Sequence, residues 1–528
     1  MKFSEIENVY YGSSSKGDLN LCSPETGFQY KIVKTTGPDS NNLTNITGVK
    51  QVSFELEYKG NAKLSNVNLS VSFFDSGILN IKWSWADPTG KRRVFGVPDE
   101  VVNTTARDLS NLVDTLDRHI VVYNEPCFRL EVKTRISPSN TPTVFTLKGF
   151  MFHEYLNWLQ VEAQAEATET EDEFRGIFGL GERSQKDFFM KSGVYPMWAT
   201  DQTDPLENGR LPGKQVYGSH PFYMWKHSSN NWIGVYHNNA NAQDWWIDND
   251  FTSGKVSIQQ IATGGLSDLY IMLPSQNPDG VVAKYHSLVG TPVLTPQWAL
   301  GWHQCKWCYR TLQDVVTSLS GYLENQIPLD AQWIDIDYMQ DYKDFTYNQA
   351  DYWGQPGAFF GLQEFIDFLH HELNMRFVPI IDAGISYRPN EDYAAFDEGV
   401  KQGVFLKEAD GSLSYGKVWA NEAVFPDFSN PQANTYWIDQ LDRFSKIIEF
   451  DGLWEDMNEA SNFCRGKCFK DDLTPFDSIA NRLPYTPTGK RLDRISLPLD
   501  AKMNDSRSQL DAHSFYGTSQ SRASSLYY

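Results

Sequence analysis

The residues most suited to chemistry lie late in the chain, where positions 453–459 read Leu-Trp-Glu-Asp-Met-Asn-Glu. A mainly apolar run at 447–452 precedes them, so we expect a buried strand that ends close to Asp456. A carboxylate beside a tryptophan at the carboxyl end of a barrel strand is well placed to be the nucleophile of a sugar-cleaving enzyme. The bare pattern from Asp456 to Glu459 would also suit a helix N-cap with an acidic first turn.

The elements that would position Asp456 form a repeated strand–helix pattern from about residue 294 onward. We expect strands at 299–302, 331–337 and 376–382 ahead of the Asp456 strand. Apolar residues on one face mark three helices between these strands: Leu312, Val315, Val316, Leu319 and Leu323; then Leu362, Phe365, Ile366, Leu369 and Leu373; then Ile438, Leu441 and Phe444. Strands that alternate with helices imply parallel βα units, in a (β/α)8 barrel or a doubly wound sheet.

Two features favour the barrel over the doubly wound sheet. The second, third and fourth expected strands end in Asp335, Asp382 and Asp456, which would gather carboxylates at one end of a barrel. No glycine-rich phosphate loop follows the first expected strand. The segment between 385 and 428 is too long for a simple connection, so we expect a functional loop or a small inserted subdomain there.

The first half of the chain has a different pattern, with apolar and polar residues alternating at 54–58, 79–85 and 128–132. This period of two, interrupted by Gly, Pro and Asn clusters, indicates an antiparallel sandwich. A chain of 528 residues is also too long for one ordinary domain. We therefore predict a multidomain protein, with an N-terminal antiparallel β-sandwich at 1–295. The first half of a catalytic (β/α)8 TIM barrel would follow at 296–528, with an inserted loop near 386–428.

Composition excludes some classes of protein. The formal net charge of −21 argues against a nucleic-acid partner, because a polyanion would be repelled. With 41% hydrophobic and 21% charged residues the chain is typical of a soluble globular protein. No apolar run is long enough to predict a transmembrane segment.

Two further signals concern compartment and thiols. The start of the chain, 1–7, lacks the apolar stretch of a signal peptide, so either the true start is missing or the protein stays inside the cell. Five N-glycosylation triplets nevertheless favour secretion mildly, at Asn42, Asn45, Asn68, Asn103 and Asn504.

Cys305 and Cys308 form a Cys-x-x-Cys pair, but no second pair of ligands lies nearby, so we expect buried thiols and not a zinc or redox site.

Several motifs follow one another in a fixed order along the chain. They are Phe-Gly-Leu-Gly-Glu-Arg at 178–183, Trp-Ala-Thr-Asp at 198–201, Pro-Gln-Trp-Ala-Leu-Gly at 296–301, Trp-Ile-Asp-Ile-Asp-Tyr-Met at 333–339, Gly-Lys-Val-Trp at 416–419 and the run at 453–459. Together they resemble glycoside hydrolase family 31, in its acid α-glucosidase, maltase-like branch. The resemblance spans most of the chain.

The resemblance implies a set of site residues. Asp456 would be the catalytic nucleophile, and Glu459 a second active-site residue that keeps Asp456 in place. Substrate would be bound by Asp201, Asp335, Trp419, Trp454 and Met457. Ordinary structural roles stay open for three of these: a loop cap for Asp201, an ion pair for Asp335 and packing for Trp419. No metal or organic cofactor is implied.

The resemblance also suggests a local disulfide between Cys464 and Cys468, just past the nucleophile. Two positions depart from the family pattern: Glu455 stands where an apolar residue is common, and Cys308 where glycine is common. By strand alternation we expect the Glu455 side chain to point away from Asp456, toward other polar groups.

One family motif is not found in these residues. The acid/base aspartate of the family lies in a Gly-His-Trp-x-Gly-Asp segment well downstream of the nucleophile, and this sequence contains no such segment. A retaining glycosidase needs that second carboxyl group. We therefore expect the chain as it stands to be an incomplete form of the enzyme, inactive or weakly active.

The chemistry implied by the resemblance is hydrolysis of α-linked glucosides from their non-reducing ends, with retention of configuration. An α-xylosidase or an α-glucan lyase of the same family is an alternative. A non-catalytic carbohydrate-binding protein is a second alternative from a different class. The expected partners are α-linked glucosides or oligosaccharides, and the location expected from the family is secreted, lysosomal or vacuolar.

Overall fold

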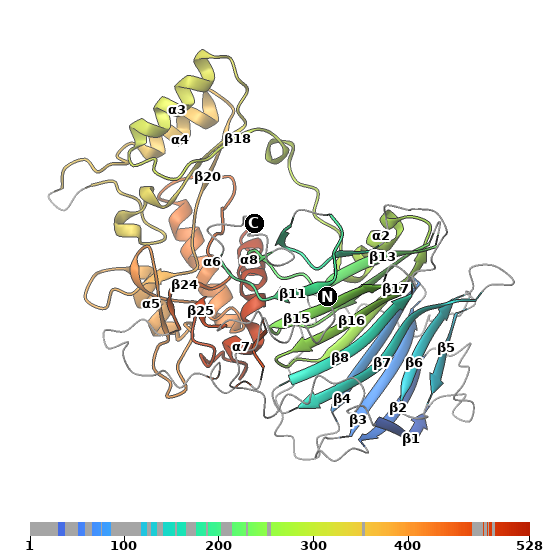
Figure 1. Cartoon of the computed structure of the whole chain (residues 1–528). Helices are drawn as coiled ribbons and strands as arrows, with labels where there is room; N and C mark the ends of the chain where they lie inside the picture. Colours follow the sequence, from blue (N-terminus) through green and yellow to red (C-terminus); the bar gives the residue numbers. More distant parts are fainter. Residues whose placement is uncertain are drawn as a thin grey trace. The chain divides into compact units, whose positions relative to one another are not determined.

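The computed structural model of the protein describes most of the chain from residue 255 onward and the strands of the first half. The described ranges are 30–36, 51–58, 66–74, 77–85, 118–123, 128–134, 141–153, 156–164, 176–185, 188–201, 214–228, 231–250, 255–350, 354–466, 479, 483, 485–487 and 492–528. The chain divides into two compact units (Figure 1). Residues 1–291 and 480–492 form the first unit, and residues 292–479 and 493–528 form the second.

The first unit contains two antiparallel sheets around one apolar core. One sheet has eight strands, in the order β1 (Tyr30–Thr36), β2 (Gln51–Tyr58), β3 (Val67–Phe74), β4 (Ile78–Trp85), β17 (Ser267–Ser275), β14 (Asn231–His237), β13 (Phe222–Ser228) and β9 (Ile177–Gly179). The other has seven, in the order β11 (Gly193–Met197), β15 (Gln243–Asp250), β16 (Lys255–Ala262), β8 (Leu156–Gln164), β7 (Thr143–His153), β6 (Arg129–Thr134) and β5 (Arg118–Tyr123).

The register of this sandwich follows from the alternating pattern in the sequence. Leu69 of β3 pairs with Phe54 of β2 on one side and with Trp83 of β4 on the other, and all three side chains are buried. Such cross-strand rows of large apolar residues are what stabilises a sheet face. The described part of the unit also contains a two-stranded ribbon of β10 (Arg183–Ser184) and β12 (Lys214–Gln215) and the helix α2 (Pro278–Val289). The predicted antiparallel sandwich is confirmed.

The second unit is built from parallel strands and the helices between them. One parallel sheet contains β18 (His303–Gln304), β19 (Ala331–Ile334) and β20 (Arg376–Pro379). The α-helices in the described part of the unit are α3 (Leu312–Glu324), α4 (Leu362–His371), α5 (Ala394–Gln402), α6 (Pro431–Ser445), α7 (Gln509–Ala512) and α8 (Tyr516–Ser525). Trp454 adds a fourth parallel partner, since it bridges to Ile380 just beyond β20. The order of these strands matches the predicted βα succession.

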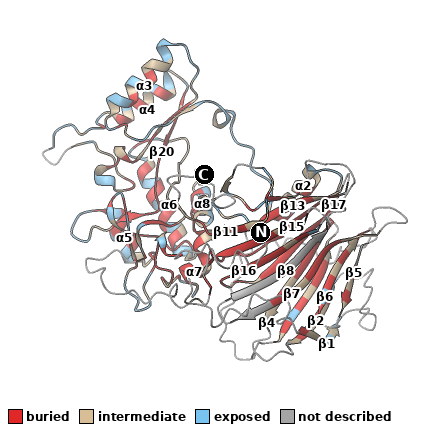
Figure 2. Ribbon diagram, in the orientation of Figure 1, coloured by how far each residue is buried: buried red, intermediate tan, exposed pale blue. Residues whose placement is uncertain are grey.

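Local sequence explains where the helices begin and which face they bury. Thr311 and Asp314 form a capping box at the start of α3, and Asn430 caps α6 ahead of Pro431. Figure 2 shows both buried and exposed residues along α3 and α4, as expected of helices that bury one side. One expected apolar position differs, because the side chain of Leu323 is 48% exposed.

Two predicted strands are placed wrongly. Residues 299–302 are not a buried strand: a 3-10 helix, η3 (Gln297–Leu300), occupies that segment, Leu300 is exposed, and the strand begins at His303. The run at 447–452 likewise begins as a turn after α6, with Ile447 exposed, and its backbone first pairs with β20 at Asp451, whose N–H donates to Phe377 O (2.9 Å). Parallel strands of two to four residues hold too few side chains for an apolar run to mark their ends.

The segment between 385 and 428 has structure of its own. It contains α5 and a three-stranded antiparallel sheet of β21 (Ile385–Ser386), β23 (Asn421–Val424) and β22 (Tyr415–Val418). Among the described residues of the unit, three other 3-10 helices occur, η4 (Ile336–Tyr338), η5 (Gln340–Tyr342) and η8 (His513–Phe515), together with the parallel pair β24 (Ser461–Arg465) and β25 (Arg494–Ser496). No helix in the described part of the chain is both long and apolar enough to cross a membrane.

Candidate active site

Asp456 lies two residues beyond the parallel bridge at Trp454, at the carboxyl ends of the strands. Trp454 donates its backbone N–H to Pro379 O (3.0 Å), and its carbonyl accepts from Ile381 N (2.9 Å), so the backbone before Asp456 is fixed in the sheet. The Oδ1 atom of Asp456 accepts a hydrogen bond from the backbone N–H of Met457 at 2.8 Å. Active sites of parallel barrels form at this end of the strands.

The segment after Asp456 is a turn and not the start of a helix. Met457 and Ala460 have φ angles of 56° and 55°, in the left-handed region that residues other than glycine rarely occupy. The backbone N–H of Ser461 donates to Met457 O (3.0 Å), which closes one turn that no helix continues. The helix N-cap interpretation of this motif is therefore wrong.

Asp335 directly follows β19 and lies near Asp456. Its Oδ1 accepts from the backbone N–H of Ile336 (2.7 Å), so Asp335 caps η4. Burial raises the pKa of Asp335, the Ile336 bond lowers it, and the negative charges of Asp456 and Asp337 raise it further. Asp456 is thus close enough to Asp335 for its negative charge to disfavour ionisation of Asp335.

Two further carboxyl groups, those of Asp382 and Asp344, are buried near Asp335 and Asp456. Asp382 follows β20 and is 4% exposed, and Asp344 is 2% exposed. Burial raises the pKa of Asp382 well above its usual range, and the charges of Asp344, Asp456, Asp335 and Glu459 raise it further. Burial also raises the pKa of Asp344, to about 8. Asp382 was recognised from the sequence only as a strand-end acid, and Asp344 carried no signal because it lies in a loop.

Glu459 belongs to the same electrostatic group, because its charge acts on Asp382. The structure therefore brings together Asp335, Asp382, Asp456 and Glu459 at the ends of β19, β20 and the Trp454 segment. We call these four residues the carboxyl cluster. Within the described residues, no group of three or more His, Cys, Asp or Glu side chains is arranged to hold a metal ion.

Cys305 also lies at this site, which the sequence did not predict. The residue is exposed and its thiol is free, whereas Cys308 is half-buried and free, so the expected pair of buried thiols is wrong. Desolvation by the surrounding protein raises the pKa of Cys305 to about 11, and the charges of Asp335 and Asp456 add to the shift. Because Cys305 directly follows β18, its place beside the cluster follows from the parallel sheet.

Aromatic side chains form two groups in the second unit. Trp454 lies against Trp333 of β19, with ring centroids 5.7 Å apart. Trp419, at the turn between β22 and β23, contacts Trp307 (5.5 Å) and Phe463 (5.1 Å), and all three rings are at least 40% exposed. An exposed group of rings is suited to stacking on a sugar face. The predicted role of Trp419 and Trp454 in substrate binding stays a prediction.

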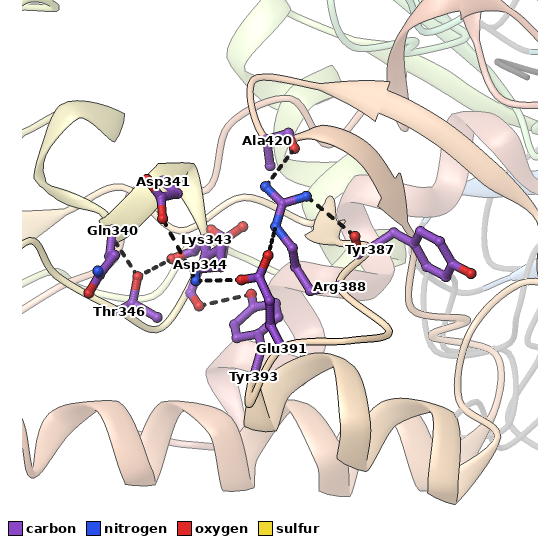
Figure 3. A network of polar contacts seen from close by, with 10 residues as sticks. All are labelled: Gln340, Asp341, Lys343, Asp344, Thr346, Tyr387, Arg388, Glu391, Tyr393 and Ala420. Atoms are coloured by element: carbon purple, nitrogen blue, oxygen red, sulfur yellow. Dashed lines mark hydrogen bonds and ion pairs between the residues drawn. The ribbon is translucent and has the colours of Figure 1, made fainter. Parts of the chain in front are cut away.

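A polar network ties the loops after β19 and β20 to the β22–β23 turn (Figure 3). Glu391 accepts from Lys343 Nζ (3.1 Å) and pairs with Arg388 Nε (3.3 Å). Arg388 donates through its two terminal nitrogens to Tyr387 O and Ala420 O, both at 3.3 Å. Since Ala420 follows Trp419 directly, Arg388 fixes the backbone beside that tryptophan.

Asp201 belongs to the first unit, whereas the carboxyl cluster belongs to the second. Its segment is well anchored there, because Trp198 donates its backbone N–H to Gln215 Oε1 (2.8 Å) and its Nε1–H to Leu492 O (3.0 Å). Thr200 pairs with Tyr217 through two backbone hydrogen bonds of 3.1 Å. The expected contact of Asp201 with sugar stays a prediction.

Two departures from the family pattern now have a structural account. Cys308 has a φ angle of 71°, a conformation that glycine adopts without strain. The carboxylate of Glu455 accepts hydrogen bonds from Ser521 and Ser524 of α8, as expected for a side chain turned away from Asp456. The Cys464–Cys468 disulfide stays a prediction, because Cys468 lies outside the described residues.

Comparisons with known proteins agree with this geometry. Residues 292–527 match the domain family described as "Glycosyl hydrolases family 31 TIM-barrel domain". Residues 68–248 match the family described as "Glycosyl hydrolase 31 N-terminal galactose mutarotase-like domain". The chain belongs to glycoside hydrolase family 31. The order of a family 31 sandwich followed by a family 31 barrel is the order predicted from the sequence.

Family 31 relatives include Glucoamylase 1 of Candida albicans, which is 32% identical over 477 residues, or 88% of this chain and 46% of the relative. Lysosomal alpha-glucosidase of Mus musculus is 34% identical over 86% of this chain and 45% of its own length. The chain thus spans less than half the length of these two family 31 relatives. A crystal structure of the glucosidase II alpha subunit has the same fold, with a TM-score of 0.73 at 18% identity over 99% of this chain and 58% of that one.

Proposed function

We propose that this chain carries the nucleophile of a retaining α-glucosidase that releases glucose from the non-reducing ends of α-glucosides. The observation that supports this most directly is the position of Asp456, two residues past the parallel bridge at Trp454 and beside Asp335. Relatives named as lysosomal alpha-glucosidase and as glucoamylase support the choice of an α-linked glucoside.

In the proposed reaction the carboxylate oxygen of Asp456 attacks the anomeric carbon and forms a bond to it. The bond from that carbon to the leaving oxygen breaks, and this oxygen takes a proton from a general acid. Water then attacks the same carbon and gives up a proton to the conjugate base of that general acid, the bond to Asp456 breaks, and glucose leaves with its original configuration. Asp335 would hold sugar hydroxyl groups, while Trp419 and Trp454 provide apolar walls.

The experiment that tests the proposal isolates the attack by Asp456. In 5-fluoro-α-D-glucosyl fluoride the leaving fluoride needs no proton, and the ring fluorine slows breakdown of the covalent product. We expect peptide mass spectrometry of the treated chain to find the sugar on Asp456, and to find none on the Asp456→Asn variant. Labelling of a different carboxylate would refute the proposal.

Other family 31 chemistries and a purely binding role are separated by related measurements. Preference for the corresponding α-xylosyl fluoride would indicate an α-xylosidase, and an unsaturated or anhydro sugar product would indicate a lyase. Calorimetric binding of maltose by a folded chain that is never labelled would support a non-catalytic carbohydrate-binding protein, and would contradict the enzyme proposal.

We also propose that the protein enters the secretory pathway, as its lysosomal relatives suggest. The triplet at Asn504 supports this, because Asn504 is exposed in a turn between Met503 and Arg507. Asn68 is exposed near the start of β3, and the other three triplets lie outside the described residues. Expression through the secretory pathway should attach an endoglycosidase-sensitive glycan at Asn504, which Asn504→Gln removes. A secreted chain that carries no glycan at Asn504 would contradict the use of this triplet.

A further inference from the structure

The backbone that carries Asp456 is held in an uncommon conformation. Met457 and Ala460 both have positive φ angles, and conformations of this kind persist only where the surroundings enforce them. The carboxylate of Asp456 is oriented by the N–H of Met457. Whatever fixes the backbone from 455 to 460 therefore fixes the direction in which the carboxylate of Asp456 points.

The contacts of Glu455 provide such a constraint on the other side of this backbone. Glu455 Oε2 accepts a hydrogen bond from Ser521 Oγ at 2.5 Å, and its Oε1 accepts from Ser524 Oγ. Each carboxylate oxygen thus has a hydroxyl donor from α8. Hydrogen bonds to a charged acceptor are about twice as strong as bonds between neutral groups.

Ser524 connects this pair to the apolar core of the second unit. The indole N–H of Trp437 donates to Ser524 Oγ at 2.8 Å, so the hydroxyl group accepts from Trp437 while it donates to Glu455. Trp437 is 1% exposed and packs edge-on against Phe345 (5.2 Å) and Phe428 (5.5 Å). Glu455 is therefore attached, through one hydroxyl group, to a large side chain that is fully buried in the core.

Close packing of α8 adds a second constraint two residues past Asp456. A Cβ atom at Gly517 would lie 3.1 Å from three atoms of Asn458, which is tighter than ordinary contact. Gly517, Ser521 and Ser524 are spaced four and three residues apart and so share one face of α8. This face lies against the segment from Glu455 to Asn458, on both sides of Asp456.

We propose that Glu455 is a positioning residue, which α8 holds through Ser521 and Ser524 so that the strained turn after it keeps Asp456 directed at the anomeric carbon. The role rests on the proposed function of Asp456. Glu455 would act on Asp456 through the backbone that joins them, without touching the substrate.

The test compares Glu455→Ala and Glu455→Gln with the double variant Ser521→Ala/Ser524→Ala, in the full chain. Hydrogen exchange at the Met457 amide is measured first, because that N–H holds Asp456 and its exchange needs no activity. We expect faster exchange in Glu455→Ala and in the serine double variant, and intermediate exchange in Glu455→Gln, which keeps one acceptor oxygen. Unchanged Met457 exchange in folded Glu455→Ala would overturn the inference.

Trapping by 5-fluoro-α-D-glucosyl fluoride supplies the second readout, taken well below the unfolding temperature. Misdirection of Asp456 should lower the maximal labelling rate roughly 10- to 100-fold, while the reagent concentration for half-maximal rate stays the same. Glu372→Ala, at an exposed glutamate just after α4, is the matched control and should leave both unchanged. Equal losses in the control, or normal labelling in all Glu455 and serine variants, would refute the positioning role.

The two proposals fail in different ways. A wild-type chain that never labels at Asp456 contradicts the proposed function, and the exchange of the Met457 amide then still decides whether Glu455 fixes the turn. A wild-type chain that labels, with labelling and exchange unchanged in the variants, contradicts the role of Glu455 alone.

Discussion

The backbone N–H of Asp382 donates a hydrogen bond of 2.8 Å to Oδ1 of Asp344, which joins two buried acids 38 positions apart. Asp344 lies in the loop after β19, and its own carbonyl oxygen accepts from the hydroxyl group of Tyr393 (3.0 Å). The side-chain Oδ1 of Asp382 is buried and has no hydrogen-bond partner among the described residues. The pair therefore lies in an environment that disfavours a second negative charge.

The first prediction concerns how stability depends on pH. The pKa of Asp344 rises from 3.8 to about 8 on folding, so the folded state holds a proton that the unfolded state releases. The proton on Asp344 therefore stabilises the folded state fully below about pH 4, and this stabilisation is lost as the pH rises through 8. One such proton changes the free energy of unfolding by about 1.4 kcal/mol per pH unit in this window.

Denaturant unfolding of the wild type and of Asp344→Asn between pH 4 and pH 8 measures this contribution. The substituted amide keeps an acceptor oxygen for the Asp382 N–H but carries no titrating proton. We expect the variant to lose stability less steeply with rising pH and to exceed the wild type at pH 8. Parallel stability curves for the two proteins would contradict the raised pKa of Asp344.

The second prediction concerns alkylation of Cys305. Because its pKa is raised to about 11, first by desolvation and then by Asp335 and Asp456, the thiol is mostly protonated at pH 7 although the residue is exposed. Alkylation by iodoacetamide should accelerate about tenfold per pH unit toward pH 10, since only the thiolate reacts. Removal of the charge in Asp335→Asn should raise the rate at fixed pH by roughly two- to tenfold.

Peptide mapping of the alkylated chain follows Cys305 separately from Cys308. Asp341→Asn, at an exposed acid that is not among the charges acting on Cys305, is the control. A Cys305 rate that is the same in wild type and Asp335→Asn would show that these two side chains are not neighbours.

The third prediction uses the conformation of Cys308. A residue with a Cβ atom at a φ of 71° is strained, and the strain is relieved when glycine replaces it. We expect Cys308→Gly to raise the free energy of unfolding by about 0.5–1 kcal/mol relative to Cys308→Ala. Both variants keep the backbone N–H that donates to Asp337 Oδ2 (3.1 Å), so the difference between them isolates the backbone term. A less stable glycine variant would contradict this account.

The fourth prediction concerns Arg388, which holds the turn beside Trp419. Loss of its bonds to Tyr387 O and Ala420 O in Arg388→Ala should loosen that turn. On the proposed function, calorimetry should find the Kd for maltose raised roughly three- to tenfold, as expected for one or two lost hydrogen bonds.

Arg443→Ala is the control for general destabilisation, because Arg443 pairs with Glu398 (2.8 Å) between α5 and α6. It should leave the affinity for maltose unchanged. If both variants weaken maltose binding equally, Arg388 has no specific role in placing Trp419.

Local patterns in the sequence were sufficient for the order of elements and for the first catalytic candidate. Cross-strand rows such as Phe54, Leu69 and Trp83 follow from period-two alternation, and the start of α3 follows from Thr311 and Asp314. Asp456 could be recognised because its neighbours in the chain form the motif. The strands at 299–302 and 447–452 were misplaced because an apolar run also suits a turn or a 3-10 helix.

Only the tertiary structure decided which residues surround Asp456. Asp344 meets Asp382, Cys305 meets Asp335, and Glu455 meets two serines of α8 more than sixty positions later. No local periodicity encodes such contacts, because they depend on parallel strands and a distant helix arriving at the same place. The raised pKa values of the buried acids have the same origin, since burial and neighbouring charge exist only once the chain has folded.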